Sequence, residues 1–361
     1  MVSEEHSTPM SDASSSPLLN ARARIADIAG AAGVSTATVD RVLNGRDGVR
    51  PATAQRVLQA AANAGYLIET GKPAREAAKP MRIEFLMPAG TNPYLRMLGD
   101  YIEFAHAQWA AQGIKCRVHY VESFNPAELA DRLLHYGQRA DGVVFMALEH
   151  PLVRDAVDTL AAQGVPAITM ISDLSNARRL AYVGIDNRSA GRTAALLLGR
   201  FLGPRPCGKI AMLAGSLNYR GHEEREIGFL HLIESSFPNV RVLGLREGHD
   251  DSERNYDQTR NLLAQHPDLA GIYNSGGGSE GVARAIVEAR PEQKILFIGH
   301  GLTPDTRALL IDGTMDALIT QTPQAIVGNC LKIFNNVREG RDTADGVKPI
   351  HFSIVLRENL P

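Results

Sequence analysis

Most of this 361-residue chain alternates short apolar segments with longer segments of helical periodicity. The apolar segments form two series, 82–87, 116–121, 142–146 and 166–171, then 209–213, 240–245, 271–274 and 294–299. The helix-like segments between them are 94–112, 127–136, 151–163, 225–235, 256–265 and 281–289. Strands that alternate with helices form parallel sheets with right-handed crossovers. Residues 81–361 are therefore predicted to form an α/β body of two Rossmann-like lobes with a cleft between them.

Polar side chains follow several of the predicted strands. Ligands of parallel sheets bind at the carboxyl ends of the strands, in the cleft that they border. The residues predicted to bind a ligand there are Asn92, Tyr94, Asp173, Tyr219, Arg225, Asp251, Asn274, Ser275, His300 and Gln321. Each of them, taken singly, also fits a solvated loop or a helix cap. Together, carboxylate, amide and guanidinium groups beside aromatic rings suit a sugar, a polyol or a related small molecule.

The segment before this body has a shorter helical pattern. Gly33 ends a first helix, Ser35 is a typical N-cap for a second one, and a third helix covers residues 52–63. The side chains expected to face inward are Ile25, Ile28, Ala29, Ala32, Val39, Val42, Leu43, Val57, Leu58 and Ala61. Two short helices joined by a tight glycine turn form a helix-turn-helix. Residues 21–66 are therefore predicted to be a small all-α DNA-binding domain.

The second helix of such a unit enters the major groove with its N-terminal side chains at the base edges. The residues predicted to contact DNA are Ser35, Thr36, Ala37, Thr38, Arg41, Asn44 and Arg50. Arg41 suits bidentate binding to guanine, which contributes roughly 1–3 kcal/mol of discrimination. A solvated Arg41, or one that contacts only phosphate, remains the alternative. Asp40 either accepts from a cytosine amine or orients Arg41.

The segment from Ile25 to Gly45, with Val49-Arg-Pro-Ala-Thr53 and Ala64-Gly-Tyr66 after it, resembles the head of the LacI/GalR family of bacterial repressors. This resemblance implies a ligand-responsive transcription regulator, expected to be a repressor. It also implies that Thr36, Ala37 and Arg41 read operator bases.

The body is similar to the ligand domain that this family shares with ribose-type periplasmic binding proteins. The similar segments are 92–94, 183–187, 225–229, 298–304 and 312–323. The similarity implies that Asn92, Tyr94, Arg225 and Gln321 contact sugar hydroxyls and the sugar ring, with Asp173 near an acidic contact.

Two positions of the body depart from that family. Gly301 stands where relatives often carry a carboxylate that binds hydroxyls, and His300 beside it is a candidate replacement. Asp250 and Asp251 stand near the place of an aromatic side chain that covers the sugar. These departures favour a ligand more polar than a simple pentose, such as a polyol or an amino sugar.

Charge and composition agree with a DNA-binding head on a soluble body. The net charge is −2, yet residues 21–80 hold nine Lys and Arg against five Asp and Glu. The three cysteines, Cys116, Cys207 and Cys330, are far apart in the sequence, which argues against a disulfide framework or a zinc site and suits the cytoplasm. Residues 1–20 read as a disordered tail without a signal peptide, residues 67–80 read as a linker, and no membrane span is expected.

No catalytic constellation, cofactor motif or metal motif is found. Gly276-Gly-Gly278 is not followed by Lys-Ser/Thr, and Ser216 lacks the G-x-S-x-G pattern, so we expect no enzyme and no cofactor. A sugar-binding or sugar-modifying protein without a regulatory role is the alternative. The expected partners are a pseudo-palindromic duplex operator, a small-molecule effector and a second copy of the chain, as a homodimer or a dimer of dimers.

The linker yields the first prediction. Family members usually carry Ala-Arg-x-Leu there, and the Leu wedges into the minor groove, whereas this chain has Ala77 at the Leu position. A methyl group is a poor wedge, and unstacking one base step costs about a few kcal/mol. The protein should therefore bend its operator less than a Leu-bearing relative does in a circular-permutation gel shift. A bend as large as the relative's would contradict this prediction.

Overall fold

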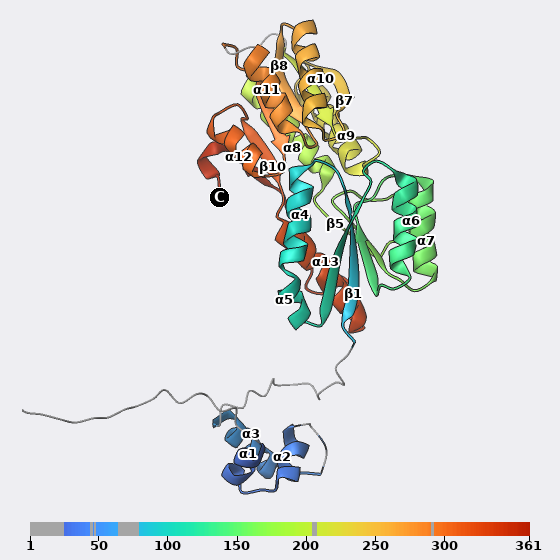
Figure 1. Ribbon diagram of the computed structural model, residues 1–361. Helices are drawn as coiled ribbons and strands as arrows, with labels where there is room; N and C mark the ends of the chain where they lie inside the picture. The colour runs from blue at the N-terminus through green and yellow to red at the C-terminus, as the bar shows by residue number, and fades with distance from the viewer. Residues whose placement is uncertain (1–24, 44–45, 47, 64–78, 204–207, 290–291) are drawn as a thin grey trace, which may run out of the picture. The chain divides into compact units, whose positions relative to one another are not determined.

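The computed structural model describes residues 25–43, 46, 48–63, 79–203, 208–289 and 292–361 (Figure 1). The chain divides into two compact units, Met1–Lys79 and Pro80–Pro361, which are described separately below. The predicted tail, Asn44, and residues 67–78 of the predicted linker with Ala77 lie outside the described residues.

The first unit contains three short helices, α1 (Ile25–Ala32), α2 (Thr36–Leu43) and α3 (Pro51–Asn63). Gly33 has a φ of 64°, which ends α1, and the hydroxyl of Ser35 accepts from the N–H of Thr38 at 3.2 Å. The helices bury one small apolar core, formed by Ile28, Ala29, Ala32, Val39, Val57, Ala60 and Ala61. The prediction of three helices around one apolar core is therefore confirmed.

Two side chains expected in this core are exposed. Ile25 is 37% exposed because it begins α1, one turn before the buried residue Ile28. Leu58 is 43% exposed, since α3 turns Val57 and Ala61 inward, and the next position along a helix faces about 100° away. Val42 and Leu43 pack against the core and remain partly exposed.

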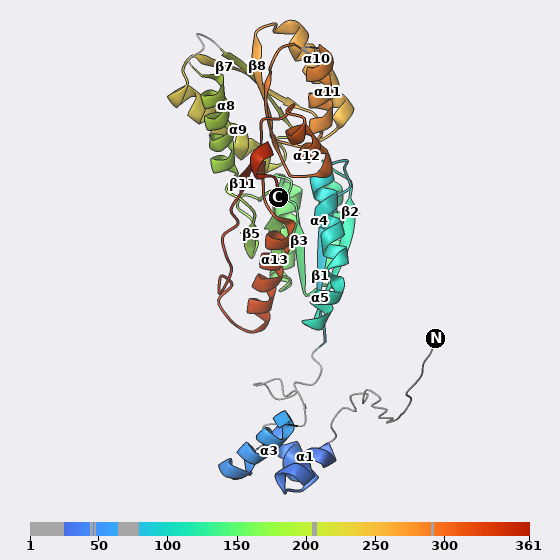
Figure 2. The same ribbon diagram turned by 90° about the vertical axis from the view of Figure 1, so that its left-hand side faces the viewer.

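The second unit contains two α/β lobes. The first lobe has a parallel sheet in the order β2-β1-β3-β4-β5. Its strands are β1 (Met81–Pro88), β2 (Ile114–Val121), β3 (Gly142–Phe145), β4 (Ala167–Met170) and β5 (Ala181–Val183). The helices on one face are α4 (Pro93–Phe104), α5 (His106–Ala111) and α13 (Pro323–Arg338), and those on the other are α6 (Pro126–Gly137) and α7 (Pro151–Ala162) (Figures 1 and 2).

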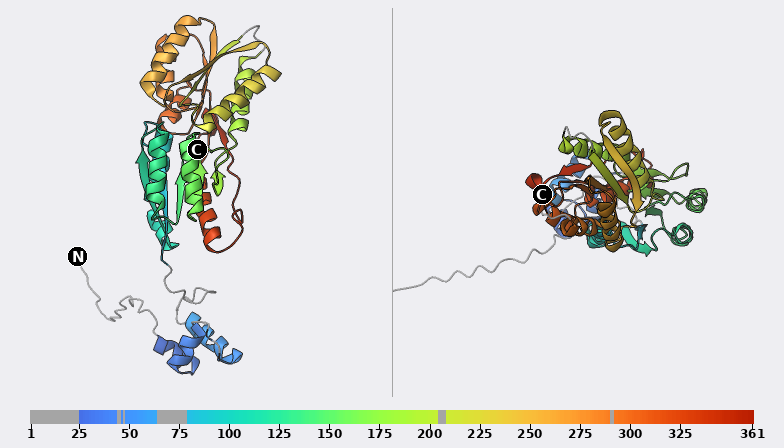
Figure 3. Two further views of the ribbon diagram at one scale, coloured as in Figure 1. Left: turned by 90° about the vertical axis from the view of Figure 1, so that its right-hand side faces the viewer. Right: turned by 90° about the horizontal axis from the view of Figure 1, so that it is seen from above.

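The second lobe has a six-stranded sheet in the order β11-β10-β9-β8-β6-β7, parallel except for β11. Its strands are β6 (Gly208–Ala214), β7 (Val240–Glu247), β8 (Leu269–Asn274), β9 (Leu296–His300), β10 (Ala317–Thr320) and β11 (Ser353–Val355). The helices are α8 (Asn187–Leu202) and α9 (Arg220–Ser236) on one face, and α10 (Ser252–Gln265), α11 (Ser279–Ala289) and α12 (Pro304–Ile311) on the other, with the short helix η1 (Arg357–Asn359) near the C-terminus. Figure 3 shows this lobe from two further sides.

The chain crosses between the two lobes three times. It enters the second lobe before α8, which packs in the core of that lobe, and it returns to the first lobe before α13. It crosses again before β11, which pairs antiparallel with β10. No helix was predicted from the sequence at α13. Its residues Ile326, Cys330 and Phe334 belong to the core of the first lobe. Each lobe therefore depends on a late segment of the chain.

Helices α8 and α9 approach each other closely because glycines face the contact. A Cβ added at Gly191 of α8 would lie 2.0 Å from the carbonyl oxygen of Arg225 in α9. A Cβ added at Gly228 of α9 would lie 2.1 Å from the carbonyl oxygen of Arg188 in α8. The two glycines thus allow α9 to lie directly against α8.

This contact gives a prediction about stability. Gly191→Ala should lower the free energy of unfolding by roughly 1–3 kcal/mol because the added methyl group meets backbone rather than a flexible side chain. Gly328→Ala is the matched control, since no atom lies within 4 Å of a Cβ added there in α13. It should raise the stability by about 0.4–1 kcal/mol. Urea denaturation of the full chain measures both changes, and equal effects of the two substitutions would contradict the close packing.

Candidate functional site

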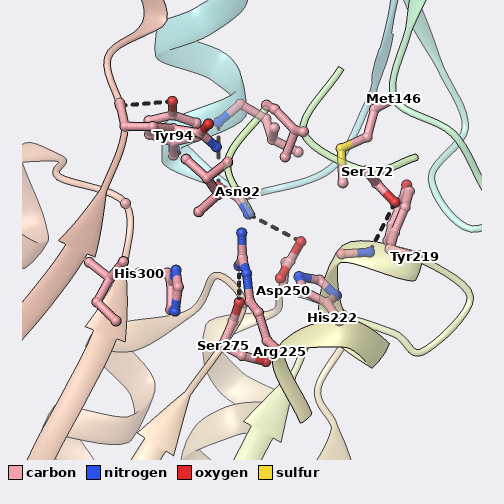
Figure 4. Close-up of a pocket in the computed structure, with 18 of the residues that line it drawn as sticks. Asn92, Tyr94, Met146, Ser172, Tyr219, His222, Arg225, Asp250, Ser275 and His300 are labelled. Carbon is pink, nitrogen blue, oxygen red and sulfur yellow. Dashed lines mark hydrogen bonds between the residues drawn. The ribbon is translucent and has the colours of Figure 1, made fainter. Parts of the chain in front are cut away.

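A pocket lies where the carboxyl ends of the strands of both lobes meet (Figure 4). The residues around it enclose about 590 Å³ of space not filled by atoms, a volume that includes open solvent. Its apolar walls are Leu95, Met146, Ile171, Ile185 and Ile319. Its polar side chains are Asn92, Tyr94, Ser172, Tyr219, His222, Arg225, Asp250, Ser275, His300, Thr320 and Gln321. The pocket thus combines an apolar interior with converging polar groups.

Seven of the ten residues predicted to bind a ligand line this pocket. They are Asn92, Tyr94, Tyr219, Arg225, Ser275, His300 and Gln321. They come from both lobes and from the segment between β10 and α13, although they are far apart in the sequence.

The other three predicted residues, Asp173, Asp251 and Asn274, do not line it. Asp173 binds the guanidinium of Arg179 and accepts from the hydroxyl of Thr169, on a separate groove. Asp251 is the N-cap of α10, where its side chain accepts from a backbone N–H. Asn274 is fully buried and binds within the glycine loop that follows β8.

Asp250, rather than Asp251, supplies the carboxylate of the pocket. Asp251 was predicted from the sequence for this role, and Asp251 does not line the pocket. Both His249 and Asp250 have a positive φ, 54° and 56°, in a region that non-glycine residues rarely adopt. These two left-handed residues turn the chain so that Asp250 faces the cleft, while Asp251 begins α10.

The carboxylate of Asp250 is held by both lobes. Its Oδ2 accepts from Nδ2 of Asn92 at 3.1 Å, and its Oδ1 accepts from the N–H of Gly277 at 2.6 Å. The hydroxyl of Thr91 donates to the backbone carbonyl of Asp250 at 3.0 Å. A Cβ at Gly276 would lie 2.6 Å from the carboxylate, so the loop can pack this closely only with glycine at that position.

Arg225 is the buried cation of the pocket, with 7% of its surface exposed. Its Nε donates to Oδ1 of Asn187 at 2.8 Å, and its Nη1 donates to the carbonyl of Ser275 at 2.6 Å. Burial lowers the pKa of the guanidinium, and the nearby tyrosines and Asp250 oppose that shift. An arginine guanidinium is not deprotonated in proteins, so the group stays charged.

Two histidines beside Arg225 are kept neutral. Burial holds the pKa of His300 well below its ordinary value, and the charge of Arg225 adds to this shift. Nε2 of His300 shares a hydrogen bond of 2.8 Å with the hydroxyl of Tyr273. Burial also lowers the pKa of His222. His222 was not predicted from the sequence, because a single histidine on a helix carries no recognisable pattern.

The position of Arg225 depends on a strained residue that follows β4. Ile171 has a φ of 65°, which costs a β-branched residue on the order of 1–3 kcal/mol. Its carbonyl accepts from the hydroxyl of Tyr182 at 3.1 Å and from Nδ2 of Asn187 at 3.3 Å. Asn187 in turn accepts from Arg225. The same residues thus fix the strained turn and the guanidinium.

Gly301 and Gln321 shape the opposite wall. Gly301 has a φ of 79°, and a Cβ there would lie 3.1 Å from Cβ of Tyr94. A carboxylate at this position, as in relatives, would therefore be strained and would crowd Tyr94. The hydroxyl of Tyr94 donates to the backbone carbonyl of Gln321 at 3.0 Å, whereas Oε1 of Gln321 is buried without a partner among the described residues. Gln321 itself lines the pocket, while this oxygen is covered in the present arrangement.

The rim of the cleft carries aromatic contacts between the lobes. Phe124 of the first lobe meets the rings of Tyr219 and His249 edge to face, with centroids 5.5 and 4.8 Å away. Burial raises the pKa of Tyr219, so its hydroxyl stays protonated. These contacts cover the pocket where the lobes meet.

The head presents its predicted DNA-contacting residues on the surface. Ser35, Thr36, Ala37, Arg41 and Arg50 are exposed and Thr38 is half-buried, while Asn44 lies outside the described residues. Asp40 pairs with Arg46 at 3.3 Å. The carboxylate of Asp40 thus contacts the loop after α2, and its role toward Arg41 stays a prediction.

The described residues contain neither a candidate membrane span nor a candidate metal site. No helix in these ranges is long and apolar enough to span a membrane. No three His, Cys, Asp or Glu side chains in the same ranges are grouped as metal ligands would be.

The contact between Asn92 and Asp250 gives a prediction. Asn92→Asp keeps an acceptor for the first N–H groups of α4 but places a second carboxylate against Asp250. Repulsion of about 1 kcal/mol should make the N–H of Gly277, which donates to Asp250, exchange at least about fivefold faster at neutral pH. Hydrogen–deuterium exchange measures this rate. Asn125→Asp, the same change at the N-cap of α6, is the control, and an unchanged rate in Asn92→Asp would contradict the proposed repulsion.

Comparison with known families agrees with this two-part architecture. Residues 24–68 match the model for bacterial regulatory proteins of the lacI family. Residues 83–342, more than half of the chain, match the periplasmic binding protein domain. A glucose-galactose binding protein from Geobacillus stearothermophilus, GanP, has a similar fold, with a TM-score of 0.70 and 22% identity over 78% of this chain and 99% of that one.

Two regulators are similar in sequence. An uncharacterised HTH-type transcriptional regulator from Streptomyces limosus is 32% identical over 215 residues, and this chain spans only 56% of its length. The HTH-type transcriptional regulator GntR from Pseudomonas aeruginosa is 28% identical over 353 residues, which cover 94% of this chain and 96% of that protein. The chain therefore belongs to the lacI family of bacterial regulatory proteins, with a helix-turn-helix head and a periplasmic binding protein domain.

Proposed function

We propose that this regulator is a cytoplasmic repressor whose operator affinity is controlled by a sugar, a polyol or a related molecule bound between its lobes. The observation that carries the proposal is the pocket in which Arg225, Asp250 and Gln321 converge. Each hydroxyl group donates one hydrogen bond and accepts others, so the several hydroxyls of one polyol can together satisfy a guanidinium, a carboxylate and an unpartnered amide oxygen.

The side chains around these groups favour the same class of ligand. The rings of Tyr94 and Tyr219 offer apolar faces for a sugar ring, and the aliphatic walls exclude water from the hydrogen bonds. Several similar proteins have names that refer to sugars, among them the ribose import binding protein RbsB of Salmonella typhimurium, at 21% identity over 206 residues.

In this proposal, ligand binding changes the arrangement of the two lobes. Contacts to Asp250 and at the Phe124 rim join the lobes directly, so a ligand that adds hydrogen bonds to both sides favours the closed arrangement. Moving such an equilibrium from 1:99 to 99:1 takes about 5.5 kcal/mol of differential binding. Several buried hydrogen bonds to charged groups provide this, at about 1.5–3 kcal/mol each.

The helix-turn-helix head would convert this change into a change of operator binding. One recognition helix is too small for high specificity, so we expect a homodimer, or a dimer of dimers, on a pseudo-palindromic operator. Closure of the lobes would then change the spacing of the two heads.

One experiment tests the whole proposal. Purified full-length protein is bound to operator DNA in a gel shift, with and without each member of a panel of sugars and polyols. A ligand that changes operator affinity supports the regulator. Turnover of a sugar would support a sugar-modifying enzyme instead. Sugar binding without any DNA binding would support a plain binding protein.

The reading of bases by Arg41 gives a prediction. Arg41→Ala should lower operator binding by roughly 1–3 kcal/mol, while binding to random DNA changes little. Arg50, which precedes α3 and is exposed, is the comparison, because we expect it to contact phosphate. Arg50→Ala should weaken binding to operator and random DNA alike. Equal losses on both DNAs for Arg41→Ala would make Arg41 a phosphate contact as well.

A further inference from the structure

The guanidinium of Arg225 has no carboxylate partner. It is buried and charged, yet its two hydrogen bonds go to neutral oxygens, those of Asn187 and Ser275. No carboxylate of the described residues lies within ion-pair distance of it. Buried charges are normally paired, because moving an unpaired ion from water into the protein interior costs about several kcal/mol of solvation free energy. This pocket is therefore electrostatically incomplete without a ligand.

The remaining N–H groups of Arg225 face the cavity. A guanidinium has five N–H donors, and two of them are used within the protein. Figure 4 shows the end of the Arg225 side chain in the pocket, between His300 and Asp250. Two parallel N–H groups on one edge of a guanidinium match the two oxygens of a carboxylate.

The acidic groups of the pocket do not serve this purpose. Asp250 is the one carboxylate among the described lining residues; its charge favours that of Arg225, but it lies beyond ion-pair distance and its two oxygens accept from Asn92 and from Gly277. Gly301 cannot be exchanged for an acidic residue without strain, as its φ and its contact with Tyr94 show. The neutral histidines add no charge.

We propose that the ligand is a sugar acid, a polyhydroxylated molecule whose carboxylate accepts two N–H bonds from Arg225. Its hydroxyls meet Asp250 and Gln321, which line the same cavity. This inference rests on the proposed function and narrows its ligand class. Asp250 binds the hydroxylated end, because a carboxylate accepts from hydroxyls and repels the acid group of the ligand.

The test compares ligands that differ only at one carbon. The full-length protein is titrated calorimetrically with two matched sets, D-gluconate, D-glucose and D-glucitol, and D-ribonate, D-ribose and ribitol. The acid of at least one set should bind at least about tenfold more tightly than its aldose and its alditol, because hydrogen bonds to a charged group are stronger than neutral ones. A neutral member that binds as tightly as the acid, or more tightly, overturns the inference and leaves the proposed function intact. Failure of every member of both sets overturns both.

Two variants test whether Arg225 is the residue that binds the carboxylate of the sugar acid. Arg225→Lys keeps the positive charge but loses the two parallel donors, so the acid should lose most of its advantage over the alditol. Arg220→Lys, five residues earlier, changes an arginine outside this pocket that pairs with Glu224, and it should leave the preference unchanged. The ratio of the acid's affinity to the alditol's is measured for each variant. A general loss of protein stability would lower both affinities and leave this ratio unchanged. An unchanged ratio in Arg225→Lys overturns the assignment of the carboxylate to Arg225.

Discussion

The pairing of Asn187 with Arg225 is the interaction on which the pocket depends. Asn187 begins α8, just after the first crossing between the lobes, and its side chain joins the carbonyl of Ile171 to the guanidinium in α9. The glycine contact between α8 and α9 sets the distance that this bridge spans. One amide therefore ties the end of the first sheet to the cation of the second lobe. A shift of α9 would move the guanidinium away from Ser275 as well.

Much of the fold could be predicted because its signals are local. The apolar segments of the two sheets, the turn at Gly33 and the cap at Ser35 each follow from a short stretch of sequence. The residues at strand ends were predicted for the same reason, since parallel strands bring their carboxyl ends to one edge. Seven of them reach one pocket because two sheets meet there.

The parts that could not be predicted depend on contacts between distant segments. Nothing local in α13 indicates that it packs in the first lobe, because its apolar stripe would fit either sheet. The choice between Asp250 and Asp251 is set by two left-handed residues, and neither is a glycine that would have marked the turn. Leu58 shows a simpler failure, in which an apolar side chain on a helix was assumed to face the core.

The left-handed backbone of Ile171 has a consequence for how this regulator can change over evolutionary time. A glycine there would remove the local strain, but it would also remove a buried side chain from the core of the first lobe, a loss of roughly 2–5 kcal/mol that exceeds the strain relieved. It would also remove an aliphatic wall of the pocket and free the carbonyl that Tyr182 and Asn187 hold. The strain at this position therefore cannot be relieved without losing both core packing and a wall of the pocket. A lineage selected for heat tolerance would have to gain its stability elsewhere.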